Sequence, residues 1–249
     1  PSFVGGLNAF KSNNAVLYGV NVEEDGIDTE KVEVILKEHK NIKIIYTIAT
    51  FQNPSGITMS LEKRKKLLAL AEKYDVMIFE DNPYGELRFA GEEVPTIKSM
   101  DKDCRVIYGG SFSKVLSPGL RLGFVSCDPA LMERMIICKQ AEDVHTTQLT
   151  QMLAYEFFTK YDIDEHIALL RKTYGEKCSF MMECMDKYFP ASVTHTHPQG
   201  GLFIFCTMPD GYDSTEVMQK ALDKGVAFVP GVTTMIDTDA VYSTFRLNY

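Results

Sequence analysis

One lysine in this chain lies among residues that suit it to carbonyl chemistry. Lys114 follows two hydroxyl-bearing residues, Ser111 and Ser113, and Arg121 comes seven positions after it. A lysine amine can form a Schiff base with a carbonyl compound, and hydroxyl and guanidinium groups can bind a phosphate dianion. The segment therefore combines a potential covalent anchor with a potential phosphate site.

Two other segments carry groups that would complete such a site. Asp81 could keep a pyridine nitrogen protonated, and Asn53 and Tyr84 could donate hydrogen bonds to a phenolate oxygen on the same ring. These are the requirements of pyridoxal 5'-phosphate, whose ring withdraws electrons while its nitrogen is protonated. The predicted cofactor-binding residues are Asn53, Asp81, Tyr84, Ser111, Ser113, Lys114 and Arg121, of which Lys114, Asp81 and Tyr84 are the predicted catalytic residues.

Each assignment has a structural alternative. Lys114 could be a surface lysine in a serine-rich loop, and Ser113 could only cap a turn. Asp81 and Asn53 lie in Asp-Asn-Pro and Asn-Pro-Ser-Gly sequences that are good turn formers. Arg121 leads into an apolar strand, where a guanidinium would need a buried anion to offset its desolvation. The cofactor phosphate would supply that anion.

The pattern of the first 125 residues predicts a sheet that brings these groups together. Apolar strands alternate with amphipathic helices, which implies a mostly parallel sheet with right-handed crossover helices. Such sheets bind ligands beyond the carboxyl ends of their strands, and Asn53, Asp81 and Lys114 all follow a strand end. The expected strands are 42–48, 76–79, 106–108 and 120–126, and the expected helices are 28–40 and 61–74, the latter capped by Ser60.

Beyond Pro129 the pattern becomes mainly helical and then mixed. Long helices are expected over 131–143, 148–160 and 163–188, followed by strands near 193, 202–206, 227–229 and 242–247 and a helix over 214–224. The fold class is therefore α/β, with a large cofactor-binding domain over 1–155. A linker helix and a small α+β C-terminal domain occupy 156–249.

The order and wording of these motifs resemble the aspartate aminotransferase superfamily, the fold type I pyridoxal phosphate enzymes of aminotransferase class I/II. The resemblance runs from Pro1–Gly5 to Phe245–Tyr249. Glu80–Tyr84 and Ser117–Arg121 are most similar to the branch that includes aminoadipate and kynurenine aminotransferases and the effector domains of MocR-type regulators.

This resemblance implies particular roles. Lys114 would carry a proton between the amino acid's α-carbon and the cofactor, and Arg246, with Asn53, would bind the substrate, the guanidinium gripping the α-carboxylate. Peptide bonds before Pro54 and Pro198 would be cis, and the protein would be a homodimer. The family's N-terminal segment, with its glycine-rich phosphate turn and a stacking aromatic side chain, precedes the part that matches Pro1, so the chain is expected to lack it.

The leading functional prediction is an aminotransferase that moves an amino group from an L-amino acid to a 2-oxo acid through Lys114 and pyridoxamine phosphate. One alternative is a pyridoxal phosphate-dependent carbon–sulfur lyase. The other is the effector domain of a MocR-type transcription regulator, whose DNA-binding module would lie upstream.

Composition narrows the setting. The chain has 249 residues, 45% of them hydrophobic, and a net charge of −8, which argues against a general nucleic-acid surface. No apolar run approaches the roughly 18–20 residues of a membrane span, so a cytoplasmic location is expected. The six cysteines include no Cys-x-x-Cys pair and are expected to be reduced thiols. No metal site is expected, because His195 and His197 fit the end of a strand better.

Overall fold

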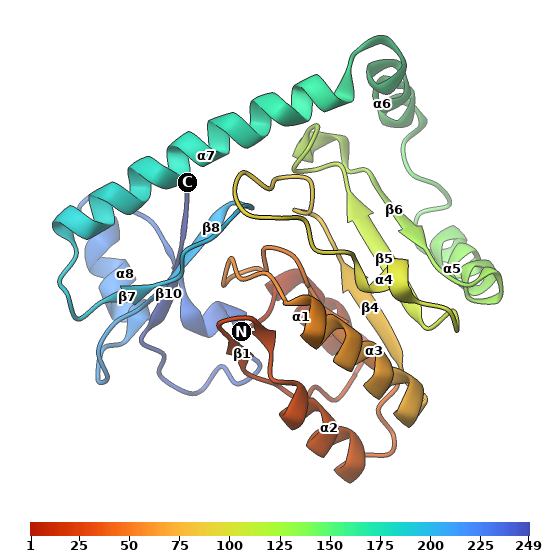
Figure 1. Cartoon of the computed structure of the whole chain (residues 1–249), viewed down its shortest axis with the longest axis horizontal. Helices are drawn as coiled ribbons and strands as arrows, with labels where there is room; N and C mark the ends of the chain where they lie inside the picture. Colours follow the sequence, from red (N-terminus) through yellow and green to blue (C-terminus); the bar gives the residue numbers. More distant parts are fainter.

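Four strands form the first sheet, in the order β3–β4–β5–β6 (Figure 1). Strands β3, β4 and β5 are parallel, as the sequence predicts, whereas β6 runs antiparallel to β5. Only a short loop with the 3₁₀-helix η1 joins β5 to β6, and an antiparallel neighbour needs no crossover helix. The bounds are β3 Ile44–Thr47, β4 Met77–Asp81, β5 Val106–Ser111, η1 Pro118–Leu120 and β6 Gly123–Ser126.

Polar side chains fix where the helices on one face of this sheet begin. Asp28 accepts a hydrogen bond from the Lys31 amide at the start of α2 (Thr29–Glu38), and Ser60 does the same for the Lys63 amide in α3 (Leu61–Tyr74). The apolar faces of these helices and of α4 (Ile97–Met100) pack on β4 and β5. This core includes Leu67, Leu70, Ala71, Ile78, Ile97 and Val106.

A buried polar pair ties these helices to the strand that ends at Asp81. Arg64 is fully buried and donates hydrogen bonds to the carbonyl oxygens of Met59 and Ala49. Glu80, also buried, accepts hydrogen bonds from the Ile97 and Lys98 amides at the start of α4. Because each group has backbone partners, the end of β4 is held firmly on this face.

The second half of the chain builds a separate antiparallel sheet. Helix α7 (Ile163–Tyr188) runs from α6 to this sheet across the molecule (Figure 1). The strand order is β7–β8–β10–β9. The bounds are α5 Pro129–Glu142, α6 Gln148–Lys160, β7 Thr194–His195, β8 Phe203–Thr207, α8 Ser214–Leu222, β9 Val229–Pro230 and β10 Thr244–Asn248.

Several short elements were not expected from the sequence. They are α1 Val4–Ser12, β1 Val22–Glu23, β2 Gly26–Ile27, α4 and the 3₁₀-helices η1 and η2 Gly231–Thr234. The structure is a computed structural model and describes residues 1–249. It has no helix with the length and apolar character needed to cross a bilayer. The boundary near residue 155 remains a prediction.

Candidate cofactor and substrate site

The register of the first sheet brings the predicted catalytic residues to one edge. Asp81 is the last residue of β4 and lies opposite Gly109 of β5. Lys114 follows the end of β5 by three positions, and Asn53 follows the end of β3 by six. Lys114 is half-buried, and its amine makes neither a hydrogen bond nor a salt bridge. An amine without a partner therefore lies at the edge where ligands of parallel sheets bind.

Three side chains at this edge form a connected hydrogen-bond chain. Asn53 Nδ2 donates to Tyr84 Oη at 3.1 Å, and Arg246 Nη1 donates to Asn53 Oδ1 at 2.8 Å. Asn53 and Tyr84 are buried, and burial raises the pKa of Tyr84 to about 12. Since Tyr84 receives a hydrogen bond through its oxygen, its own hydrogen is free to be donated to an anionic oxygen.

Arg246 comes to this chain from β10 of the second sheet. Its guanidinium lies over the Phe203 ring, 4.3 Å from the centroid, and Nε is buried without a hydrogen-bond partner. No carboxylate of the chain forms a salt bridge with it. Burial lowers the pKa of Arg246, with the nearby Tyr84 opposing that shift. A half-buried cation with an unused, buried donor nitrogen fits a small carboxylate ligand.

Asp81 has one oxygen engaged and one unengaged. Tyr46 Oη donates to Asp81 Oδ2 at 2.7 Å, while Oδ1 accepts no hydrogen bond. Burial raises the pKa of Asp81, and the hydrogen bond from Tyr46 works against that rise. Sequence reasoning missed Tyr46, although a phenol within an otherwise apolar strand was a signal that its hydroxyl needs a partner.

The predicted phosphate residues lie at the end of β5 and in the loop after it. Ser111 Oγ accepts a hydrogen bond from the Ser113 amide at 3.2 Å, which shapes the turn before Lys114. Arg121 is exposed, has a left-handed backbone with φ of 53°, and donates to the Pro118 carbonyl oxygen. Arg121 is therefore not the desolvated guanidinium expected from the sequence. Its assignment to phosphate remains a prediction based on position.

The segment before Asn53 is supported from the second half of the chain. The Asn53–Pro54 peptide bond is cis, as predicted, whereas the bond before Pro198 is trans, so that prediction was wrong. Phe51 is fully buried with φ of 51°, and the Arg88 guanidinium lies 4.7 Å from its ring centroid. Gly200 packs against the same ring. Gly200, in the turn after Pro198, thus packs against Phe51, a residue with a strained backbone two positions before Asn53.

We expect Gly200→Ala to destabilise the fold by about 1–3 kcal/mol. A Cβ at this position would overlap the Phe51 ring and approach the Leu87 carbonyl oxygen to 2.5 Å. Urea denaturation measures the effect. Gly119→Ala is the matched control, because its Cβ would meet nothing closer than 3.8 Å. Equal unfolding midpoints for the two variants would contradict the tight packing at Gly200.

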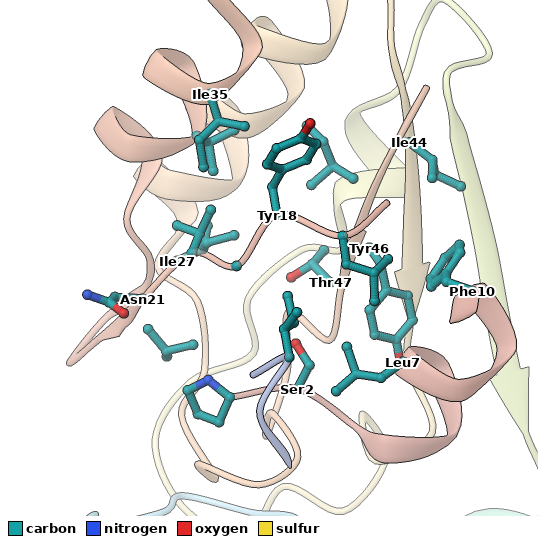
Figure 2. Close-up of a pocket in the computed structure, with 18 of the residues that line it drawn as sticks. Ser2, Leu7, Phe10, Tyr18, Asn21, Ile27, Ile35, Ile44, Tyr46 and Thr47 are labelled. Atoms are coloured by element: carbon teal, nitrogen blue, oxygen red, sulfur yellow. The ribbon is translucent and has the colours of Figure 1, made fainter. Parts of the chain in front are cut away.

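A cavity of about 940 Å³ lies beside the outer edge of β3, and most of its lining is apolar (Figure 2). Tyr46 lines it, with Leu7 and Phe10 of α1 close by, whereas Lys114 does not. The cavity therefore reaches Tyr46, whose hydroxyl donates to Asp81, but it does not include the Lys114 amine.

Comparison with known proteins gives the family. The family model for aminotransferase class I and II matches residues 1–249, and the chain belongs to this family. It is 40% identical over its whole length to aromatic-amino-acid aminotransferase 1 of Thermococcus litoralis and 36% identical to 2-aminoadipate transaminase of Thermus thermophilus. It covers 60% and 63% of those proteins, so it spans about three fifths of their length.

A solved structure gives the same result for the fold. The chain superimposes along its entire length on 62% of a Pyrococcus horikoshii kynurenine aminotransferase, with a TM-score of 0.95 and 39% identity. That protein was crystallised with pyridoxamine phosphate (PMP), with KYN as substrate and KYA as product. The predicted α/β fold of an aminotransferase is confirmed.

Proposed function

We propose that this chain provides the catalytic lysine and the substrate carboxylate site of a pyridoxal phosphate-dependent aminotransferase. The observation that carries the proposal is the joining of Asn53, Tyr84 and Arg246 at the sheet edge that also holds Asp81 and the free Lys114 amine. Family membership and the aminotransferase names of the relatives support the same assignment. The carbon–sulfur lyase and regulator alternatives are less well supported by these names.

The side chains present fit the cofactor. The unengaged Asp81 Oδ1 suits a protonated ring nitrogen, and the free hydroxyl hydrogen of Tyr84 suits the ring oxygen. Ser111, Ser113 and Arg121 would bind the phosphate. When bound, pyridoxal phosphate supplies an aldehyde and an electron-withdrawing ring.

The residues of the chain then have distinct tasks. The Lys114 amine would hold the aldehyde carbon of the cofactor and, when not bonded to it, would move the proton at the α-carbon of the amino acid. Arg246 binds the α-carboxylate and so presents that carbon to the amine. Asn53 orients both Tyr84 and Arg246 because its amide bonds to each of them.

The proposed reaction is tested with the full-length protein loaded with pyridoxal phosphate. A panel of amino acids, including aromatic amino acids and 2-aminoadipate, is mixed with 2-oxoglutarate, and glutamate formation is measured. We expect glutamate from at least one donor. Release of pyruvate and ammonia from cystathionine without an oxo acid would instead indicate the lyase. Neither product, together with binding of a DNA operator, would indicate the regulator.

The proposal extends to assembly and location. Large apolar side chains are exposed on α5 and α6, among them Ile137, Leu149 and Leu153, and such patches often mark protein contacts. They support a homodimer. Six free cysteines support a reducing compartment such as the cytoplasm.

A further inference from the structure

Tyr46 is placed by the register of the sheet to reach Asp81. In the parallel pair, Tyr46 lies opposite Phe79, so Asp81 is the diagonal neighbour two residues further along and on the same face. A long aromatic side chain can span such a diagonal. The phenol of Tyr46 does so and donates to Asp81 Oδ2 at 2.7 Å.

The ring of Tyr46 is fixed by its neighbours. The Phe79 ring stacks at 5.9 Å between centroids, and Phe10 of α1 meets it edge-on at 5.8 Å. Gly6 of α1 lies so close that a Cβ there would approach Tyr46 Cζ to 2.8 Å. Figure 2 shows Tyr46 beside Leu7 and Phe10. Because α1 closes over the ring, the hydroxyl has a defined position relative to the Asp81 carboxylate.

We propose that Tyr46 is a positioning residue: its phenol holds Asp81 by Oδ2 and leaves Oδ1 for the ring nitrogen of the cofactor. The inference rests on the proposed function, since it assigns Asp81 to that nitrogen. Tyr46 is not among the site residues expected from the sequence. In the proposed role it contacts Asp81 and touches neither cofactor nor substrate. Its effect passes through the orientation and charge of one carboxylate.

The test variant is Tyr46→Phe in the full-length protein, which removes the hydroxyl and keeps the ring. We expect kcat to fall about 10- to 100-fold and the Kd for pyridoxal phosphate to rise about tenfold or more. The KM for the amino donor should change little, because Arg246 is untouched. Tyr18→Phe is the matched control, since Tyr18 lines the same cavity and its hydroxyl makes no hydrogen bond.

A second readout does not depend on the cofactor. Carbon NMR of the cofactor-free protein follows the titration of Asp81. The titratable groups that interact electrostatically with this carboxyl are Tyr46 and Tyr84. Tyr46→Phe should raise the pKa of Asp81, because a donor to the carboxylate is lost.

The outcomes separate the two ideas. An Asp81 titration that is the same in Tyr46→Phe and in the unaltered protein would overturn the role of Tyr46, whatever the activity. Equal kcat and cofactor Kd for Tyr46→Phe and Tyr18→Phe would overturn it as well. An unaltered protein that forms no glutamate would count against the proposed function, while the NMR titration would still decide the role of Tyr46.

Discussion

Replacing Lys114 by alanine is expected to lower the transamination turnover by about a thousandfold or more. Under the proposed function, the variant loses both the amine that anchors the cofactor and the group that moves the proton at the α-carbon. Positioned proton transfer alone is worth about 10² to 10⁴ in rate. Glutamate formation measures turnover. Mass spectrometry after borohydride reduction measures covalent attachment, which we expect on the unaltered chain and not on the variant.

Because Lys114 has no partner in the structure, its loss should not affect folding. Lys102→Ala serves as the control, since Lys102 is an exposed lysine that makes no salt bridge. Transamination at the unaltered rate in Lys114→Ala would remove this lysine from the mechanism.

Replacing Arg246 by alanine should raise the KM for every amino donor by about 30-fold or more. The α-carboxylate is common to all of them, and truncating one partner of a buried charged pair costs about 2–5 kcal/mol. Steady-state kinetics with several donors measures the change. Arg246→Lys keeps the charge without the planar two-pronged donor. Its KM for amino donors should lie between that of the unaltered protein and that of Arg246→Ala.

An amine substrate that lacks a carboxylate distinguishes two effects of the Arg246 variants: the loss of carboxylate binding and the loss of the contact that positions Asn53. Its reaction should depend on Arg246 only through the contact with Asn53, so its KM should change less than that of the amino acids. Lys102→Ala, at an exposed lysine that makes no salt bridge, is again the control. An unaltered KM for amino acids in Arg246→Ala would place the carboxylate site elsewhere.

Local patterns were enough to predict much of the first sheet. The Ser60 cap, helical periodicity and apolar runs predicted α2, α3 and the parallel strands to within about three residues. Strand ends followed by Asn53 and Asp81 gave the functional edge, because parallel topology alone brings carboxyl ends together.

Features that depend on contacts between distant segments could not be predicted. The bond between Tyr46 and Asp81 requires the register of β3 against β4, which no local pattern specifies. The exposure of Arg121 follows from a left-handed turn that replaces the expected strand start. Likewise, the contact of Gly200 with Phe51 joins segments that are far apart in the chain.

The side-chain amide of Asn53 connects the loop that carries Tyr84, at the edge of the first sheet, to β10 of the second sheet. Its nitrogen end is committed to a phenol and its oxygen end to a guanidinium, so a flip would set N–H against N–H. The amide therefore links Arg246 of β10 to Tyr84 in one orientation only. Under the proposed function, a carboxylate that binds Arg246 would therefore also change the hydrogen bond between Asn53 and Tyr84.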